Sequence, residues 1–101
     1  MLTQKAKVVT LITVFEAEEA VRTAFARLGV TRFSTAHIEG IGAHGRKRSG
    51  LSENKNLEFV IVASDALAER VLSWVDRELL PNHPSIAYST DATAVTTGPL
   101  P

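Results

Sequence analysis

Residues 7–15 (KVVTLITVF) and 16–28 (EAEEAVRTAFARL) decide the fold, because the spacing of apolar side chains changes where the two stretches meet. The first is nearly continuous in β-branched and apolar residues, which is typical of a buried strand. In the second, apolar residues recur every three or four positions, so the sequence predicts an amphipathic helix. Gly29 is well suited to end this helix.

The same pattern returns about 50 residues later in the chain. Residues 57–63 (LEFVIVA) predict another buried strand, and Ser64 is a favourable N-cap for a second helix that ends before Pro81. Each half is completed by a more polar strand, predicted at residues 32–41 and 85–96. The chain is therefore expected to hold two βαβ units joined by a long loop.

This order predicts an α+β fold, the ferredoxin-like βαββαβ sandwich, with a four-stranded antiparallel sheet and both helices on one face. The long loop, at about residues 40–56, lies between strands 2 and 3. At 101 residues the chain predicts a single domain, with a frayed tail at residues 97–101 that contains two prolines. The second face of the sheet has no cover within the chain, which favours self-association.

The composition excludes several classes of protein. Eleven basic and eleven acidic residues cancel, so we expect no nucleic-acid partner. The absence of cysteine rules out disulfide scaffolds, thiolate metal sites and cysteine nucleophiles. No run reaches the ~18 apolar residues of a membrane span, and we expect a cytoplasmic protein.

The most informative short motif is GIGAHG at residues 40–45, which has the spelling G-x-G-x-x-G. A dinucleotide fold needs a helix directly after this motif, and the following RKRSG is a poor helix start. Glycines still allow backbone N–H groups to approach an anion closely. Four basic side chains against one glutamate lie between residues 44 and 56, so the sequence predicts an anion site with His44 as one ligand contact.

Metal and catalytic sites are less well supported. The three histidines, His37, His44 and His83, match no metal-ligand spacing. His37 and Glu39 share a strand face and could exchange protons, but any polar strand face would show such a pair. We therefore expect no enzyme, no catalytic residue and no bound metal or cofactor.

The chain resembles the PII signal-transduction proteins, in particular the PII-like branch linked to bicarbonate transporters and carboxysomes. The resemblance rests on the layout of elements and on two motifs, EGIGAHGR at residues 39–46 and YSTD at residues 88–91. It implies a homotrimer in which open sheet faces meet and adenine nucleotides bind in clefts between subunits. Bound ligand would act on the long loop, and the loop would dock on a regulated protein.

Carried onto this sequence, the resemblance assigns three groups of residues. The phosphates would meet Gly40, Gly42, Gly45 and Arg46, with His44 beside them. The base would meet the neighbour's last strand, largely through its backbone, at Ile86, Ala87 and Tyr88. The partner-binding part of the loop would be Lys47, Arg48, Ser49 and Gly50.

Two differences from classical PII proteins narrow the expected ligand and the expected regulation. Residues 84–101 contain no lysine or arginine to hold a triphosphate, which favours AMP, ADP or cyclic AMP over ATP. The loop also has no tyrosine, so control by uridylylation should be absent. Bicarbonate is a candidate co-ligand, and a membrane transporter or a carboxysome component is a candidate partner. The alternative is a trimeric metal-binding protein of the CutA type, which shares the fold.

Overall fold

The computed structural model describes residues 1–39 and 55–101. Its elements follow the predicted order. The strands are β1 (Gln4–Val14), β2 (Ser34–Glu39), β3 (Lys55–Ala63) and β4 (Ser85–Ala94). The helices are α1 (Glu18–Leu28), preceded by the 3-10 turn η1 (Phe15–Ala17), and α2 (Asp65–Trp74), which continues as the π-helical stretch η2 (Val75–Leu79).

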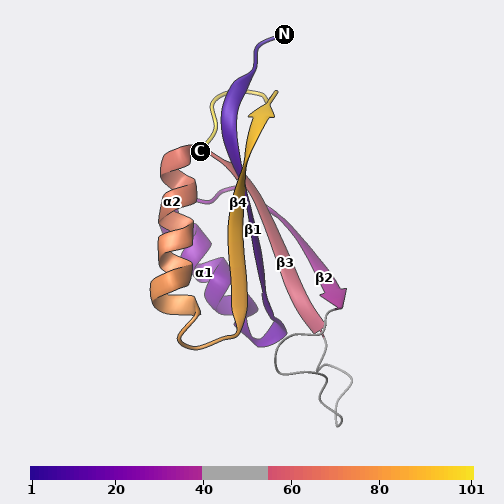
Figure 1. The fold of residues 1–101 in the computed structure, drawn as a ribbon, viewed down its shortest axis with the longest axis vertical. Coiled ribbons are helices and arrows are strands. Elements are labelled where there is room, and N and C mark those ends of the chain that lie inside the picture. Colours follow the sequence, from indigo (N-terminus) through magenta and orange to yellow (C-terminus); the bar gives the residue numbers. More distant parts are fainter. Residues whose placement is uncertain (40–54) are drawn as a thin grey trace.

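The four strands pair in an antiparallel sheet with the order β2-β3-β1-β4. β1 and β3 are therefore central, and β2 and β4 form the two edges. Both helices cover the same face of the sheet (Figure 1). The predicted ferredoxin-like sandwich is confirmed.

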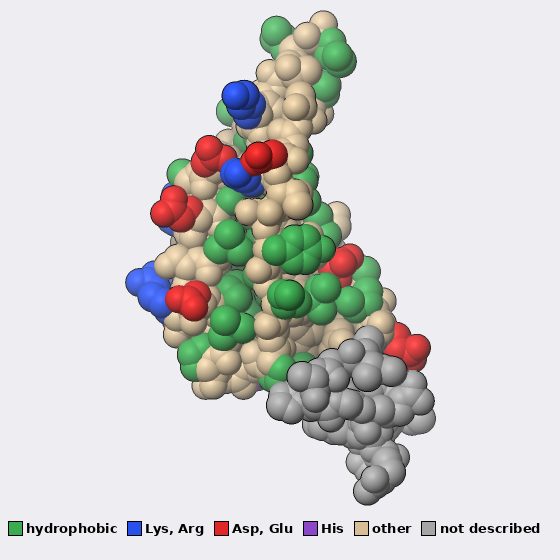
Figure 2. Space-filling view, viewed as in Figure 1, with side chains coloured by type: hydrophobic (Ala, Val, Ile, Leu, Met, Phe, Trp, Pro, Cys, Tyr) green, Lys and Arg blue, Asp and Glu red, His purple; other side chains and the backbone are tan. Residues whose placement is uncertain are grey.

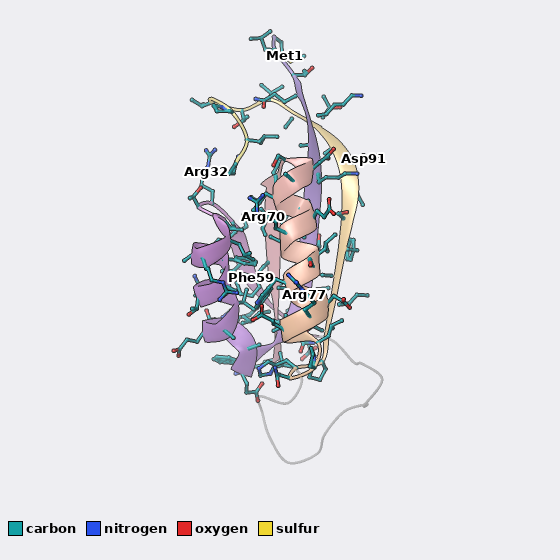
Figure 3. All side chains as sticks on the ribbon, turned by 90° about the vertical axis from the view of Figure 1, so that its left-hand side faces the viewer. Met1, Arg32, Phe59, Arg70, Arg77 and Asp91 are labelled. Atoms are coloured by element: carbon teal, nitrogen blue, oxygen red, sulfur yellow. The ribbon has the colours of Figure 1, made fainter. Side chains whose placement is uncertain are left out.

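The core lies between the helices and the sheet, and alternate residues of the central strands fill it. On β3, Leu57 and Phe59 are almost completely buried, as the period of two in a strand requires. The Phe25 ring of α1 packs edge-on against Phe59, with 5.5 Å between ring centroids, and against Trp74 at 6.5 Å. Figure 3 shows Phe59 between the two helices and the sheet. Trp74 thus has a packing role.

Local capping explains where the helices begin and end. The Ser64 hydroxyl accepts a hydrogen bond from the Leu67 N–H at 3.2 Å, which confirms Ser64 as the N-cap of α2. Gly29 ends α1 in the left-handed region, with φ of 94°, and its N–H donates to the Phe25 carbonyl. Both positions were predicted because each residue type has a specific physical advantage there.

The second face of the sheet, here called the open face, carries the other set of alternate residues. No helix or strand in residues 1–39 and 55–101 packs over its middle (Figure 1). Val62, Ile86 and Tyr88 are 43%, 58% and 47% exposed on this face. Figure 2 shows hydrophobic side chains exposed around β4 in the middle of the molecule. The expected uncovered apolar face is present.

Element boundaries differ from the predictions by a few residues. β1 begins at Gln4, three residues early, because residues 4–6 still pair with β4. β2 begins at Ser34 and β4 ends at Ala94, each two residues inside its predicted limit. Residues 16 and 17 belong to the 3-10 turn η1 before α1.

The tail beyond β4, which the sequence predicts to be frayed, makes two hydrogen bonds to the rest of the fold. The Gln4 side-chain amide donates a hydrogen bond to the Gly98 carbonyl at 3.0 Å. The Ser64 N–H donates to the Pro101 carbonyl, also at 3.0 Å. Ser64 lies at a helix N-terminus, where backbone N–H groups lack partners within the helix. The tail therefore satisfies a donor that the helix leaves open, and it crosses the end of the sheet to do so.

Within residues 1–39 and 55–101, no helix has the length and apolar character needed to cross a membrane.

Candidate functional site

The glycine-rich motif begins directly after β2, at the lower end of the sheet. Here β2 ends at Glu39 and β3 begins at Lys55, and these two residues face each other across the strands (Figure 1). Nine predicted site residues lie outside the described residues: Gly40, Gly42, His44, Gly45, Arg46, Lys47, Arg48, Ser49 and Gly50. The structure fixes the two points at which their segment joins the sheet.

The second predicted group, Ile86, Ala87 and Tyr88, lies on β4. Alternation in the strand separates the three side chains. Ile86 and Tyr88 point to the open face, whereas Ala87 packs against the core beneath the helices. A ligand on the open face would thus meet two of these side chains, and Ala87 would contribute only backbone.

The strand that precedes the first predicted group and the strand that holds the second are opposite edges of the sheet. Glu39 ends the edge strand β2, and Ser85 begins the edge strand β4, with β3 and β1 between them. Three strand spacings separate these edges, roughly 14 Å in total. In one chain, the two central strands therefore separate the end of β2 from the start of β4.

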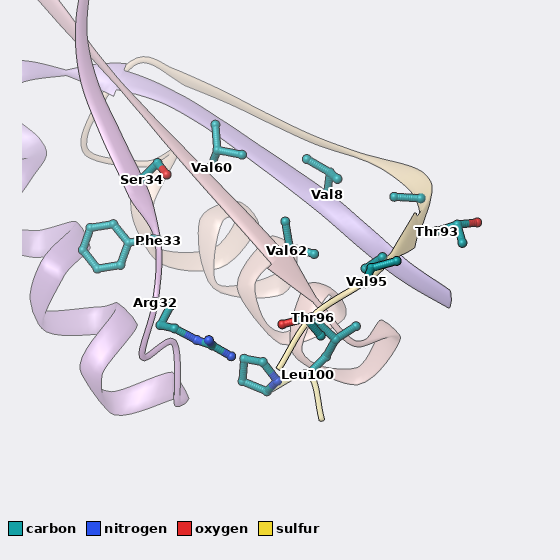
Figure 4. Close-up of a pocket in the computed structure, with 13 residues that line it drawn as sticks. Val8, Arg32, Phe33, Ser34, Val60, Val62, Thr93, Val95, Thr96 and Leu100 are labelled. Carbon is teal, nitrogen blue, oxygen red and sulfur yellow. The ribbon is translucent and has the colours of Figure 1, made fainter. Parts of the chain in front are cut away.

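A cavity of about 550 Å³ opens at the upper end of the open face, where β3 ends and the tail crosses the sheet (Figure 4). We call it the tail pocket. Most of its wall is apolar, and three hydroxyl groups add polar contacts. It is lined by thirteen residues: Val8, Arg32, Phe33, Ser34, Val60, Val62, Ala92, Thr93, Ala94, Val95, Thr96, Leu100 and Pro101.

The register explains why distant residues meet in the tail pocket. Val8 pairs with Val62, and Ser34 pairs with Val60, so these side chains share the open face. The tail supplies the opposite wall, including Leu100. The sequence does not predict this pocket, because the tail is expected to be frayed.

Among the described residues that line the tail pocket, Arg32 is the one with a charged side chain. It precedes β2, and the sequence places it only at the start of the strand predicted at residues 32–41. Figure 4 shows its side chain extending toward Leu100, whereas the Phe33 ring points away. A basic residue next to a strand start is a weak sequence signal, so only the fold reveals that Arg32 reaches the tail.

Asp91, which looks isolated in the sequence, pairs with Lys7 across the β1–β4 ladder. The hydrogen bond from the Lys7 ammonium and its positive charge lower the pKa of Asp91. The same hydrogen bond and the negative charge of Asp91 raise the pKa of Lys7. Both groups are exposed, so the pair is a surface ion pair.

His37 and Glu39 share the helix-side face of β2, as predicted. The His37 ring packs edge-on against Phe15, with 5.9 Å between ring centroids. Among the described residues, no three His, Asp or Glu side chains lie close enough to hold a metal ion.

Solved structures share the whole architecture. A crystal structure of a PII-like signalling protein from Thermus thermophilus is 26% identical, with a TM-score of 0.79 and 94% coverage of both chains. CPII, a nitrogen regulatory PII-like protein from Thiomonas intermedia, was solved bound to ADP, AMP and bicarbonate. It is 14% identical, with a TM-score of 0.79 over 95% of this chain and 99% of CPII. No protein of curated function matches the sequence.

The family comparison agrees with the structural one. The family described as nitrogen regulatory protein P-II matches residues 6–98, which is most of the chain. Proteins of this family are signalling regulators and not enzymes. The chain described here therefore belongs to the P-II family.

Proposed function

We propose that this protein is a homotrimeric sensor that binds an adenine nucleotide between its subunits and passes the signal to a protein partner. AMP, ADP or cyclic AMP is the expected ligand. Membership in the P-II family and the overall likeness to CPII, a protein solved with ADP and AMP, support this proposal. The observation that carries it is the placement of the candidate ligand surfaces at separate ends and edges of one sheet.

The separation argues for a site shared by two copies. The glycine motif starts at the lower end of β2, after Glu39, and the tail pocket lies beside Ser34 at the upper end. Five residues of extended strand separate these ends, roughly 17 Å. If the glycine motif binds phosphate and the tail pocket or β4 binds the base, one subunit must supply the first and a neighbour the second.

The volume and the lining of the tail pocket support its use as a nucleotide subsite. Its volume of about 550 Å³ lies within the usual range of roughly 300–1,000 Å³ for small-molecule sites. The valines would provide apolar contacts for a purine, and the hydroxyls of Ser34 and Thr96 would offer hydrogen bonds. The open face next to it, at Ile86 and Tyr88, is the other candidate for the base.

The open face supports self-association of the chain, and family membership favours the trimer. Ile86 and Tyr88 are about half exposed on a sheet face that the described residues leave uncovered. Apolar surface of this kind is favourable to bury, at roughly 25 cal/mol per Å². Closed symmetry among identical chains would cover all such faces at once.

Signalling would use the segment that joins β2 to β3. The residues proposed to contact phosphate, from Gly40 to Arg46, directly precede the proposed partner-binding residues 47–50 in the sequence. Nucleotide binding controls the partner only if the ligand binds the competent state of this segment more tightly than the other state. We propose bicarbonate as co-ligand, and a membrane transporter or a carboxysome component as partner.

Calorimetric titration with AMP, ADP, ATP and cyclic AMP, each with and without bicarbonate, tests the proposal. We expect saturable binding close to one nucleotide per subunit, with ATP not the preferred ligand. Light scattering on the same samples should give the mass of a trimer. Absence of binding by all four nucleotides would contradict the sensor function, and metal titration would then test the CutA-type alternative.

A further inference from the structure

One acidic residue, Glu58, lies in the middle of the open face. It belongs to the central strand β3, and its partners in the two ladders are Ile12 on β1 and Ala36 on β2. Alternation places its side chain on the same face as Val60 and Val62. Every other strand residue that lies on this face within residues 1–39 and 55–101 has a neutral side chain at pH 7. Glu58 is therefore a single carboxylate on a largely apolar surface.

No basic group in the described part of the chain neutralises Glu58. The three ion pairs of this part of the chain all involve other acidic residues. Arg32, at the upper end of the same face, comes four residues before Ala36, which is roughly 13 Å along an extended chain. The other titratable strand residue on this face is Tyr88, which is uncharged at pH 7 and lies on β4, beyond β1.

Self-association through the open face would remove Glu58 from water. In the single chain its side chain is partly exposed, so water still solvates the carboxylate. Burial of an unpaired carboxylate in an apolar interface is strongly unfavourable, whereas the neutral acid is buried at a much lower cost. The described strands of a second open face bring no basic side chain, because that face is a copy of the first. The carboxylate would therefore take up a proton from solvent when the faces close.

We propose that Glu58 links assembly of the protein to pH, because each subunit binds one proton at this residue when its open face is covered. This inference rests on the proposed trimer, which buries the open face. The assembled state then holds more protons than the free chains, so assembly strengthens as the pH falls and weakens as the pH rises. The effect begins above about pH 4.3, where a glutamate in water is ionised. With one proton per subunit, the association constant of the trimer falls by at most about a thousandfold per pH unit, a factor of about ten for each subunit.

Sedimentation equilibrium of the intact protein, over a dilution series between about pH 5 and about pH 8, tests the inference. We expect the association constant of the trimer to fall by at least about tenfold across this range. Glu58→Gln should assemble more tightly than the original protein at pH 8 and should lose most of the pH dependence, because its amide is neutral throughout. The histidines also titrate in this range, but the variant retains them. The part of the pH dependence that Glu58→Gln removes therefore belongs to Glu58.

Glu69→Gln is the matched control, since it makes the same chemical change and the same change in net charge. Glu69 is exposed on α2, the helix that covers the opposite face of the sheet (Figure 1). This variant should keep the pH dependence of the original protein. If the trimer is too tight to dissociate on dilution, the concentration-dependent urea midpoints of the three proteins report the same differences.

Two results would overturn the inference and leave the proposed function in place. The same pH dependence in Glu58→Gln and in the original protein would mean that Glu58 stays in water after assembly. Assembly that strengthens as the pH rises, and that Glu58→Gln weakens, would mean that the carboxylate pairs with a basic group of a neighbouring copy. A monomer at every pH would overturn the proposed trimer together with this inference.

Discussion

The two faces of the sheet are built from the same strands but differ in how far their side chains are buried. On the helix-covered face, Leu57, Phe59 and Ile61 of β3 are at most 1% exposed. On the open face, the side chain of Val62 on the same strand is 43% exposed. Ile86 and Tyr88 of β4 are 58% and 47% exposed. The described residues cover one face and leave much of the other exposed. The first face specifies the fold, and the second is the surface that we propose for contacts with other copies of the chain and with ligand.

A substitution in the core beneath the helices should have the largest effect on stability. Phe59→Ala would leave a cavity beneath Phe25 and Phe33, whose rings contact Phe59. We expect a loss of about 3–5 kcal/mol in the free energy of unfolding. Urea denaturation followed by circular dichroism measures it. A loss below about 1 kcal/mol would contradict the assignment of Phe59 to a tightly packed core.

Charging the open face should act on assembly instead. Tyr88→Asp would place a carboxylate where apolar faces are proposed to meet, and burying an unpaired charge is strongly unfavourable. We expect the trimer to dissociate while the far-UV spectrum stays unchanged, as light scattering and circular dichroism would show. The control is Ala26→Asp on the exposed side of α1, which should remain a trimer. A trimer that survives Tyr88→Asp would remove this face from the interface.

Removal of the N-cap of α2 should destabilise the protein less than the core substitution does. Ser64→Ala removes the hydroxyl that accepts the Leu67 N–H, and the loss of an N-cap typically costs about 1 kcal/mol. Ser73→Ala, the same chemical change inside α2, should cost at most a few tenths of a kcal/mol. Equal urea midpoints for Ser64→Ala and Ser73→Ala would contradict the role of Ser64 as an N-cap.

The surface pair Lys7–Asp91 should have the smallest effect on stability. The direction in which this effect changes with pH follows from the two pKa shifts. Because Lys7 lowers the pKa of Asp91, the pair stabilises the protein above the ordinary aspartate pKa of about 3.9, and this contribution is lost as the pH falls through the lowered value. Because Asp91 raises the pKa of Lys7, the contribution is also lost as the pH rises through that raised value.

Urea midpoints at about pH 6 and about pH 3 would measure the acidic side of this dependence. Asp91→Asn should reduce the difference between the two midpoints slightly, since it removes the group whose pKa is lowered. An unchanged difference would mean that the pair has no linkage to folding.

The fold was predictable because the apolar patterns and the helix caps all indicate the same order of elements. The nearly continuous β-branched and apolar run of β1, the change of period at α1, and the caps at Gly29 and Ser64 all have local causes, and the structure confirms them. These features depend on residues close together in the sequence. Local physics was therefore enough to give the order βαββαβ.

The candidate site was less predictable because it depends on contacts between distant residues. The tail contains no apolar period, yet hydrogen bonds to Gly98 and Pro101 hold it across the sheet. The tail pocket and the reach of Arg32 follow from this crossing and from the strand order, which no local pattern encodes. The roles of the glycine motif and of Arg46 remain predictions.

Subunit complementation tests the central claim, that neighbouring copies share each ligand site. Arg46→Ala would damage the proposed phosphate wall, and Arg32→Ala would damage the tail pocket. Each variant alone should bind AMP weakly. Co-expressed as mixed trimers, which native mass spectrometry can verify, they should regain a minority of tight AMP sites, because some clefts then combine an intact wall with an intact pocket. Mixed trimers that bind AMP no better than either parent would contradict a site shared between subunits.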